Sequence, residues 1–281
     1  MAKRQYGFDE AKIQRFDKEK RGQGAGNEYK PWLTIQDVAS KGLSSRIHGR
    51  TTGREHHLLS KLEAGAFFLY DWEDSVTDIR EQYPLDREET RAIAEEMGIK
   101  HPYDSRGAVD IVMTTDFLVD ISSDDGEKMI ARSVKPAEDL NNARTIEKQE
   151  IERRYWQGKD IDWGIITEHE LPEKRIKKLR WLHEMLSLEH LEVPYSGYWE
   201  EKCQLFLNLL VETSNISAHE MIRMLENKYG FPSGVGLNVL RFLASNKVIG
   251  IDLDSNLSIK TIMLDAQTIN QIRVENFVRS A

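Results

Sequence analysis

Acidic and basic side chains that could hydrolyse a phosphodiester lie in two neighbouring apolar segments, residues 108–120 and 129–136. Asp116 is in the first segment and Lys135 is in the second. Both segments are rich in β-branched residues, and the Asp-Asp-Gly sequence at 124–126 is typical of a hairpin turn. We therefore expect an antiparallel hairpin with an acid on one strand and a lysine on the next, which is the skeleton of a metal-dependent nuclease.

A second carboxylate, Glu63, lies on the apolar side of a helix predicted from Glu55 to about Asp74. At 100° per residue, one arc of this helix collects Leu58, Leu59, Leu62, Ala66, Phe67, Leu69 and Tyr70. Glu63 falls inside the arc, and His56 lies near its edge. A buried carboxylate is costly unless something pairs with it, so Glu63 is either in a salt bridge or cap, or is a metal ligand.

These residue types fit hydrolysis assisted by magnesium. Glu63 and Asp116 are the expected ligands of an ion that activates water and neutralises charge at phosphorus. Lys135 would orient the water or stabilise the transition state. Ser133 shares a strand face with Lys135, and the backbone carbonyl of Val134 could complete the ligand set.

Other chemistries find little support in the sequence. His56 and His57 have no matching Cys or His pair at the spacing of a zinc site. The chain lacks a Walker-type phosphate loop, and its serines lack a G-x-S-x-G setting.

The elements that position these residues predict an α/β domain with a mixed sheet. Residues 75–85 form a strand ended by Pro84, and residues 86–98 form a short helix. A helix over 138–160 closes at Gly158, and a strand over 162–167 follows. A strand–helix–strand order implies a parallel crossover, so we expect helix, three strands, helix and strand in a mixed sheet.

Strand periodicity assigns the faces of the first hairpin strand. Asp116, Leu118 and Asp120 should share one face, with Phe117, Val119 and Ile121 on the other. On the 138–160 helix, Glu152 lies near Lys148 and Tyr155. Charges in such a position are more often a solvated face than a site.

The N-terminal region is basic although the whole chain is acidic. Residues 1–57 hold 12 Lys or Arg against 7 Asp or Glu, whereas the formal net charge of the chain is -8. A net negative charge disfavours a nuclease that holds DNA unaided, so we expect a basic arm to touch DNA and another protein to deliver it. Arg46, Arg50 and Arg54 are the candidate DNA contacts. Residues 1–30 are expected to be a disordered tail, or else an arm that orders on DNA.

The 281 residues suggest two domains, 1–168 and 169–281. The single cysteine, Cys203, excludes a disulfide framework, and no signal peptide or run of 18 apolar residues is visible, so we expect a cytoplasmic protein without a membrane segment. The second domain has four amphipathic helices, within 173–186, 197–212, 217–230 and 233–248.

Two strands around Asp254-Ser255-Asn256 should follow these helices, and helices followed by a β-hairpin suggest a winged-helix module. Such modules bind DNA or proteins. Arg241 and Lys247 give the would-be recognition helix little positive charge, which favours protein contact at least as much as base reading.

Several segments between residues 28 and 167 resemble TnsA, the endonuclease subunit of a two-protein transposase. They are EYKPWLTIQDV, GREHHLLSKLE, VTDIREQYPL, MTTDFLVD, VKPAEDL and LNNARTIEKQEIERRYW. The resemblance implies a restriction-endonuclease-like catalytic domain followed by a winged-helix-like domain. It also implies cutting of the 5′ ends of a mobile element with magnesium, for which manganese substitutes. A DDE-type partner, TnsB, would cut and join the 3′ ends, and an ATP-dependent regulator, TnsC, would bind the nuclease subunit.

Carried over by position, the resemblance assigns catalytic roles to Glu63, Asp116, Lys135 and the helical Glu152. This chain departs from the family at Ser133, where the family has glutamine and the wider superfamily an acid. A hydroxyl is a poorer magnesium ligand than a carboxylate, so the second metal site would depend on waters or on the Val134 carbonyl. Two rival functions stay open: a catalytically inactive nuclease fold that bridges TnsB and TnsC, and a stand-alone restriction or repair nuclease.

Overall fold

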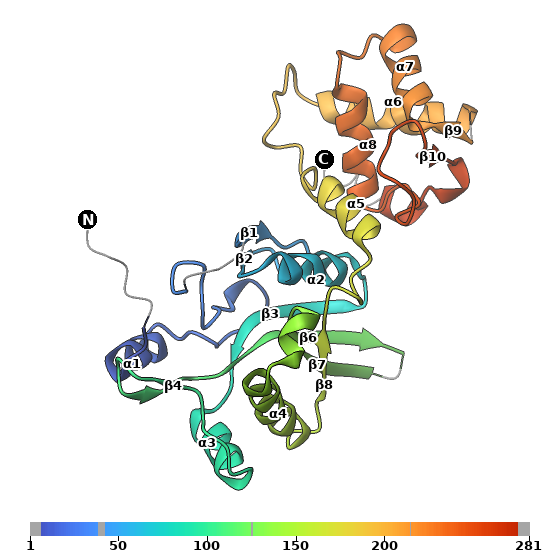
Figure 1. Ribbon diagram of the computed structural model, residues 1–281. Coiled ribbons are helices and arrows are strands. Elements are labelled where there is room, and N and C mark those ends of the chain that lie inside the picture. Colours follow the sequence, from blue (N-terminus) through green and yellow to red (C-terminus); the bar gives the residue numbers. More distant parts are fainter. Residues whose placement is uncertain (1–6, 39–42, 125, 214, 275–281) are drawn as a thin grey trace. The chain divides into compact units, whose positions relative to one another are not determined.

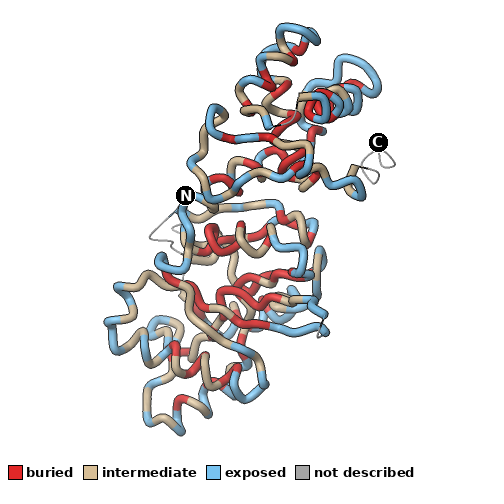
Figure 2. Tube along the Cα trace, turned by 90° about the vertical axis from the view of Figure 1, so that its right-hand side faces the viewer, coloured by how far each residue is buried: buried red, intermediate tan, exposed pale blue. Residues whose placement is uncertain are grey.

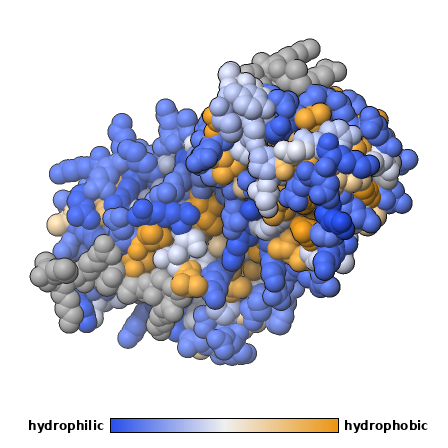
Figure 3. All heavy atoms as spheres, turned by 90° about the horizontal axis from the view of Figure 1, so that it is seen from above, coloured by the Kyte–Doolittle hydropathy of each residue, from blue (hydrophilic) through white to orange (hydrophobic). Residues whose placement is uncertain are grey.

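The computed structural model describes residues 7–38, 43–124, 126–213 and 215–274. The chain divides into two compact units, residues 1–171 and 172–281, whereas the sequence placed the division at 168/169. Within the described ranges, no helix combines the length and the apolar character needed to cross a membrane. In both units the buried residues line the inner sides of the elements, and hydrophilic residues cover most of the visible surface (Figures 2 and 3).

A four-stranded mixed sheet is the centre of the first unit (Figure 1). Its order is β3 (Val76–Pro84), β6 (Thr114–Ser123), β7 (Gly126–Val134) and β8 (Asp162–Ile166). The first two pairings are antiparallel, and β7 and β8 are parallel. The predicted strand order and the parallel crossover are therefore confirmed. The predicted turn at 124–126 is described only in part, because residue 125 lies outside the described residues.

One helix covers each face of this sheet. Helix α2 (Lys61–Trp72) packs through Tyr70 against Phe117 of β6. Helix α4 (Ala143–Gln157) lies on the opposite face, where Ile151 and Trp156 join a core cluster with Leu118. Figure 1 shows α2 and α4 on the two sides of the strands. Neighbouring strand residues point to opposite faces, so Phe117 and Leu118 bind one helix each.

Both helices begin where side chains cap them. The Ser60 hydroxyl accepts a hydrogen bond from the Glu63 backbone nitrogen at 3.1 Å, which starts α2 at Lys61. The prediction that this helix begins at Glu55 is wrong, because residues 55–58 form strand β2 (Glu55–Leu58) with β1 (Ser45–His48). Asn142 caps α4, which ends at Gly158 as predicted.

The N-terminal segment is part of the fold. Helix α1 (Glu10–Lys18) buries Ile13 and Phe16, which form a core cluster with Phe8, Trp32, Val109 and Val112. The expectation of a disordered tail is wrong for residues 7–30, and residues 1–6 lie outside the described ones. The segment has few apolar residues of its own, but those distant in the sequence complete its core.

The remaining elements of the first unit are short. They are η1 (Gly26–Glu28), α3 (Arg87–Glu96), η2 (Ala137–Asn141) and a small antiparallel pair, β4 (Tyr103–Asp104) and β5 (Val109–Asp110). Helix α3 confirms the short helix predicted over 86–98.

The second unit is mainly helical. It contains α5 (Glu173–His183), α6 (Tyr198–Thr213), α7 (Ala218–Tyr229) and α8 (Val235–Ser245), which confirm the four predicted helices. Strand β9 (Ile216–Ser217) pairs antiparallel with β10 (Met263–Leu264), and η3 (Ala266–Thr268) follows.

The hairpin predicted within residues 250–265 is wrong, because only Met263–Leu264 is a strand there. A local side-chain bond turns the backbone instead, because Asp252 accepts a hydrogen bond from the Asp254 nitrogen at 2.9 Å. Lys178 of α5 also donates to the Ser255 hydroxyl at 2.7 Å.

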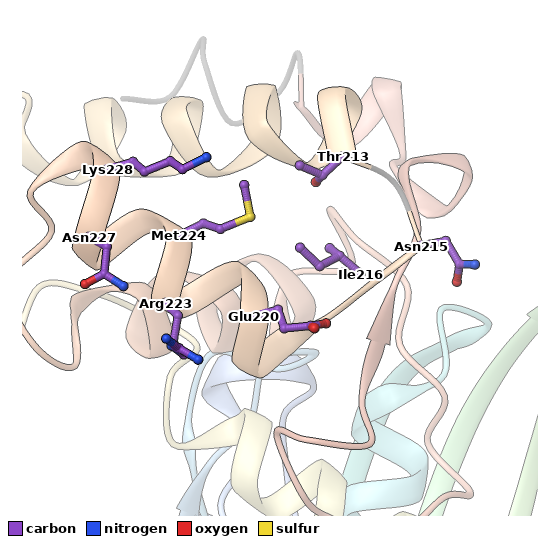
Figure 4. Close-up of a pocket in the computed structure, with 8 residues that line it drawn as sticks. All are labelled: Thr213, Asn215, Ile216, Glu220, Arg223, Met224, Asn227 and Lys228. Atoms are coloured by element: carbon purple, nitrogen blue, oxygen red, sulfur yellow. The ribbon is translucent and has the colours of Figure 1, made fainter.

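A cavity of about 440 Å³ opens in the second unit beside α6, β9 and α7. The side chains of Ile216 and Met224 point into the space between α6 and α7 (Figure 4). None of the residues that the sequence predicted for the site lies in the lining of this cavity.

Candidate active site

Asp116 is the centre of the polar cluster where β6 begins and β7 ends. Its Oδ2 accepts hydrogen bonds from the Lys135 ammonium at 2.6 Å, the Val134 backbone nitrogen at 2.6 Å and the Ser133 hydroxyl at 3.3 Å. Ser133 and Lys135 therefore reach the same oxygen, as expected for residues that share a strand face. Asp116 is buried, whereas 28% of the Lys135 side chain is exposed.

Glu63 approaches Asp116 from the first turn of α2. Its Oε2 accepts hydrogen bonds from the Leu59 backbone nitrogen at 2.8 Å and from Gln82 Nε2 at 3.4 Å. Burial, and then the negative charge of Asp116, raise the pKa of Glu63 to about 7. Two buried carboxylates with one lysine leave a place where a further cation would be stabilised.

Gln82 on β3 joins the two carboxylates, and the sequence analysis missed it. Its Nε2 lies 3.2 Å from Asp116 Oδ1 as well as 3.4 Å from Glu63, and its Oε1 accepts from the Thr114 hydroxyl at 3.1 Å. A glutamine in a strand is usually a surface residue, so nothing in the sequence indicated that Gln82 lies beside the carboxylates.

The first part of β6 does not alternate strictly. Thr115 meets Glu152 and Trp156 on the α4 side, and Leu118 packs on that side too, three residues further along. An even alternation would place Thr115 and Leu118 on opposite faces. The predicted alternation is therefore wrong at this end of the strand, and Asp116 turns toward Glu63 of α2.

Glu152 lies buried on α4, behind the two strands. Its Oε1 accepts hydrogen bonds from Thr115 Oγ1 at 2.9 Å and from Trp163 Nε1 at 3.0 Å. Burial raises the pKa of Glu152 to about 7, and the Lys135 ammonium acts in the opposite direction. Glu152 therefore lies near Lys135 and not on a solvent-exposed face of α4. The described residues contain no group of three or more His, Cys, Asp or Glu side chains placed to hold a metal, so Glu152 does not complete an acidic triad.

The donor set still fits magnesium. Glu63 and Asp116 supply two hard carboxylates, and the Val134 carbonyl, which accepts from Lys135 Nζ at 3.0 Å, lies beside them. Magnesium commonly uses one or two protein carboxylates and fills its other positions with water or substrate phosphate. The Ser133 hydroxyl is instead a donor to the Asp116 carboxylate.

The three arginines predicted as DNA contacts differ in exposure. Arg54 is buried, and its guanidinium donates to Glu81 Oε1 at 2.9 Å and to the Ile79 carbonyl at 2.8 Å. It offers no charge to a phosphate, so its assignment as a DNA contact is withdrawn. Arg50 donates to backbone carbonyls at the end of α2, at Asp71 and Trp72.

Arg46 remains an exposed candidate, with 43% of its side chain accessible and Glu55 3.5 Å away. A further basic residue was missed. Burial, and then the positive charges of Arg144 and Lys135, lower the pKa of Lys148 on α4. Arg144, Lys148 and Glu152 follow at intervals of four residues, so they form one helix stripe that leads to the site.

Comparisons with known proteins identify the family of the chain. Residues 73–168 match the family described as TnsA-like endonuclease N terminal, and residues 170–253 match TnsA endonuclease C terminal. The chain is also 42% identical over 253 residues to the Transposon Tn7 transposition protein TnsA of Escherichia coli, with 90% of each chain covered. Asp116, Lys135 and Glu152 lie inside the first match, and Glu63 precedes it.

Proposed function

The chain belongs to the TnsA endonuclease family, and from this premise we propose that it is a magnesium-dependent DNA endonuclease that cuts the 5′ ends of a transposon during cut-and-paste transposition. The observation that carries the proposal is the meeting of Glu63, Asp116 and Lys135, from three separate elements, with Gln82 between the two acids. Lys135 follows β7 and pairs with Asp116 of β6, and Gln82 joins Asp116 to Glu63 of α2.

Each side chain has a role in this proposal. Glu63, Asp116 and the Val134 carbonyl would hold magnesium, and manganese would substitute for it. When bound, the metal supplies an activated water and neutralises charge on the phosphoryl oxygens. The Lys135 ammonium, which Asp116 holds in place, stabilises the negative charge that develops at the phosphate. Glu152, buried behind it, acts on the lysine through its charge.

Ser133 supports Asp116 in this scheme rather than binding metal. Its hydroxyl donates to Asp116 Oδ2 and thereby helps to orient the carboxylate. A single metal ion is the simplest arrangement for two acidic ligands, since Ser133 stands where the wider superfamily provides another acid.

Phosphate contacts would come from the exposed Arg46 and from Lys148. Lys148 is exposed, and partial desolvation, and then the positive charges of Arg144 and Lys135, lower its pKa. A phosphodiester on this side of α4 would relieve that repulsion. The net charge of -8 opposes strong DNA binding by the chain alone, so a TnsB-type DDE transposase would deliver the transposon end.

The second unit would serve assembly. Its order α6, β9, α7, α8 and β10 supports a winged-helix-like module, with a two-residue ladder in place of a full wing. The Arg241 guanidinium on α8 already pairs with Glu184 and the Trp181 carbonyl, so it offers little to DNA. We assign to this unit the contact with a TnsC-type ATP-dependent regulator.

The metal requirement tests the proposal. Purified chain would be mixed with the partner transposase and end-labelled transposon DNA, with magnesium, manganese, calcium or a chelator. Cutting of the 5′ strand is expected with magnesium and manganese only, and Asp116→Asn should abolish it. Undiminished cutting of the 5′ strand in the presence of the chelator would contradict the proposal. If the wild type does not cut the 5′ strand with any of the metals, the alternative of an inactive bridging subunit would be favoured.

A further inference from the structure

Gln82 is a buried amide placed between two acids. Only 2% of the residue is exposed, and its nitrogen faces Glu63 Oε2 and Asp116 Oδ1. In the ionised form that binds a cation, carboxylate oxygens accept hydrogen bonds and cannot donate them, so the amide nitrogen, not its oxygen, faces the two acids. On the other side of the amide, the Thr114 hydroxyl donates to Gln82 Oε1 at 3.1 Å.

The backbone of Gln82 has an unusual conformation that directs this side chain. Its φ is 50°, in the left-handed region that residues other than glycine rarely adopt. Its carbonyl accepts a hydrogen bond from the Trp32 nitrogen at 3.2 Å, and the preceding Glu81 is held by Arg54. Surrounding structure thus stabilises a strained residue at the point where β3 passes the two carboxylates, which is the pattern expected of a residue with a functional role.

We propose that Gln82 is a positioning residue for the metal site, whose amide holds Glu63 and Asp116 in the orientation that binds a divalent cation. This inference rests on the proposed function, because it concerns the ligands of the same site. A carboxylate oxygen can accept two hydrogen bonds, so the amide occupies one position on Asp116 Oδ1 and leaves the other for the cation. Glu63 Oε2 accepts from both Leu59 and Gln82, so Glu63 would bind the cation through its other oxygen.

A neutral amide suits this position better than a charged side chain would. A second lysine or an arginine there would neutralise the acids and compete with the metal, whereas a carboxylate would add to their repulsion. The amide instead supplies hydrogen bonds to both charged groups without reducing their negative charge. Partners that orient metal ligands in this way commonly contribute tenfold or more to metal affinity.

The direct test measures metal binding without DNA. Isothermal titration of the full chain with manganese would compare the wild type with Gln82→Met, which keeps the length of the side chain and removes the amide. We expect the dissociation constant for manganese to rise by about tenfold. The magnesium concentration for half-maximal cutting should rise by a similar factor, with much of the rate recovered at saturating magnesium.

A matched control is available on α4. Gln149 is also a buried glutamine, and its Oε1 has no hydrogen-bond partner among the described residues. Gln149→Met makes the same chemical change and should leave the manganese affinity as in the wild type. Thr114→Val removes only the bond that orients the Gln82 amide, and should weaken manganese binding by about threefold, as expected for one neutral hydrogen bond.

The outcomes separate the inference from the function beneath it. If the folded Gln82→Met chain binds manganese as tightly as the wild type, or more tightly, the inference is overturned. If that variant does not fold, an unchanged affinity in Thr114→Val overturns it instead. A wild-type chain that binds no manganese and cuts no DNA would contradict the proposed function itself.

Discussion

Replacing Glu81 by glutamine should strongly destabilise the first unit. The carboxylate is fully buried on β3, where it accepts hydrogen bonds from Arg54, from His56 Nδ1 at 2.8 Å and from the His57 nitrogen at 3.1 Å. Burial alone would raise the pKa of Glu81, but the hydrogen bonds from Arg54 and His56 outweigh it and lower the pKa from 4.5 to about 2.

The size of the effect follows from this pKa. Each tenfold change in proton affinity corresponds to about 1.4 kcal/mol, so the charged form of Glu81 stabilises the fold by about 3 kcal/mol. Glu81→Gln also leaves the buried Arg54 guanidinium without an anion, and breaking a buried pair costs roughly 3–5 kcal/mol. Because the folded pKa is depressed, this stabilisation is complete above the unfolded value of 4.5 and is lost as the pH falls toward 2.

Urea unfolding from pH 7 down to pH 3 would measure the difference between wild type and Glu81→Gln. Hydrogen exchange on peptides from β2 and β3 would assign the loss to the first unit, since the chain has two units and need not unfold in one step. We expect a loss of about 3 kcal/mol at pH 7 that narrows to under half of that near pH 3.

An exposed glutamate provides the control. Glu55 is 54% exposed and only 3.5 Å from the exposed Arg46, so Glu55→Gln should cost less than about 0.5 kcal/mol. A loss below about 1 kcal/mol for Glu81→Gln, or a loss independent of pH, would refute the reasoning about the buried carboxylate.

Three further predictions concern the site and the basic residues. Lys135→Ala should reduce cutting of the 5′ strand by at least about a hundredfold, as loss of a transition-state charge does, while circular dichroism shows a folded chain; a similar loss of fold would point to a structural salt bridge. Ser133→Glu should preserve or raise the cutting rate in a magnesium titration, since it adds a carboxylate ligand, and a complete loss would mean that the strand packs differently. Arg54→Ala should lower the melting temperature without changing the salt dependence of DNA binding, whereas Arg46→Ala should keep the melting temperature and reduce the salt slope by about one; the reverse pattern would contradict the assignment of the two arginines.

Much of the first unit could be predicted because its signals are local. Residues 114–134 are rich in β-branched residues and contain the Asp-Asp-Gly turn sequence, and α4 is composed of strong helix formers that end at Gly158. The three principal site residues, Glu63, Asp116 and Lys135, were also visible, since a carboxylate on an apolar helix arc and an acid–lysine hairpin are unusual by type and place.

The errors arose where distant residues or backbone geometry decide the structure. The core of α1 depends on Val109 and Val112, about a hundred residues further along the chain. Arg54 was predicted to be a surface residue, but it is buried because it pairs with Glu81. The two residues are distant in the sequence, and only the folded sheet brings them together. The position of the Gln82 side chain between the two acids depends on a left-handed φ, which no sequence pattern predicts.

The prediction of a C-terminal hairpin was wrong because of local side-chain hydrogen bonds. Residues 250–262 have apolar alternation, but Asp252 and Ser258 bind the backbone two residues further along and favour turns. The alternation alone could not weigh these side-chain bonds against a strand ladder.

The central claim is tested most directly by mapping cut positions on labelled transposon-end DNA, strand by strand, with magnesium and the TnsB-type and TnsC-type partners present. Wild type and Asp116→Ala would be compared in parallel. The account predicts that the wild type cuts the 5′ strand and that Asp116→Ala loses this cut alone, while cutting of the 3′ strand continues. A wild-type reaction in which the 3′ strand is cut and the 5′ strand stays intact would contradict it and indicate a bridging subunit without nuclease activity.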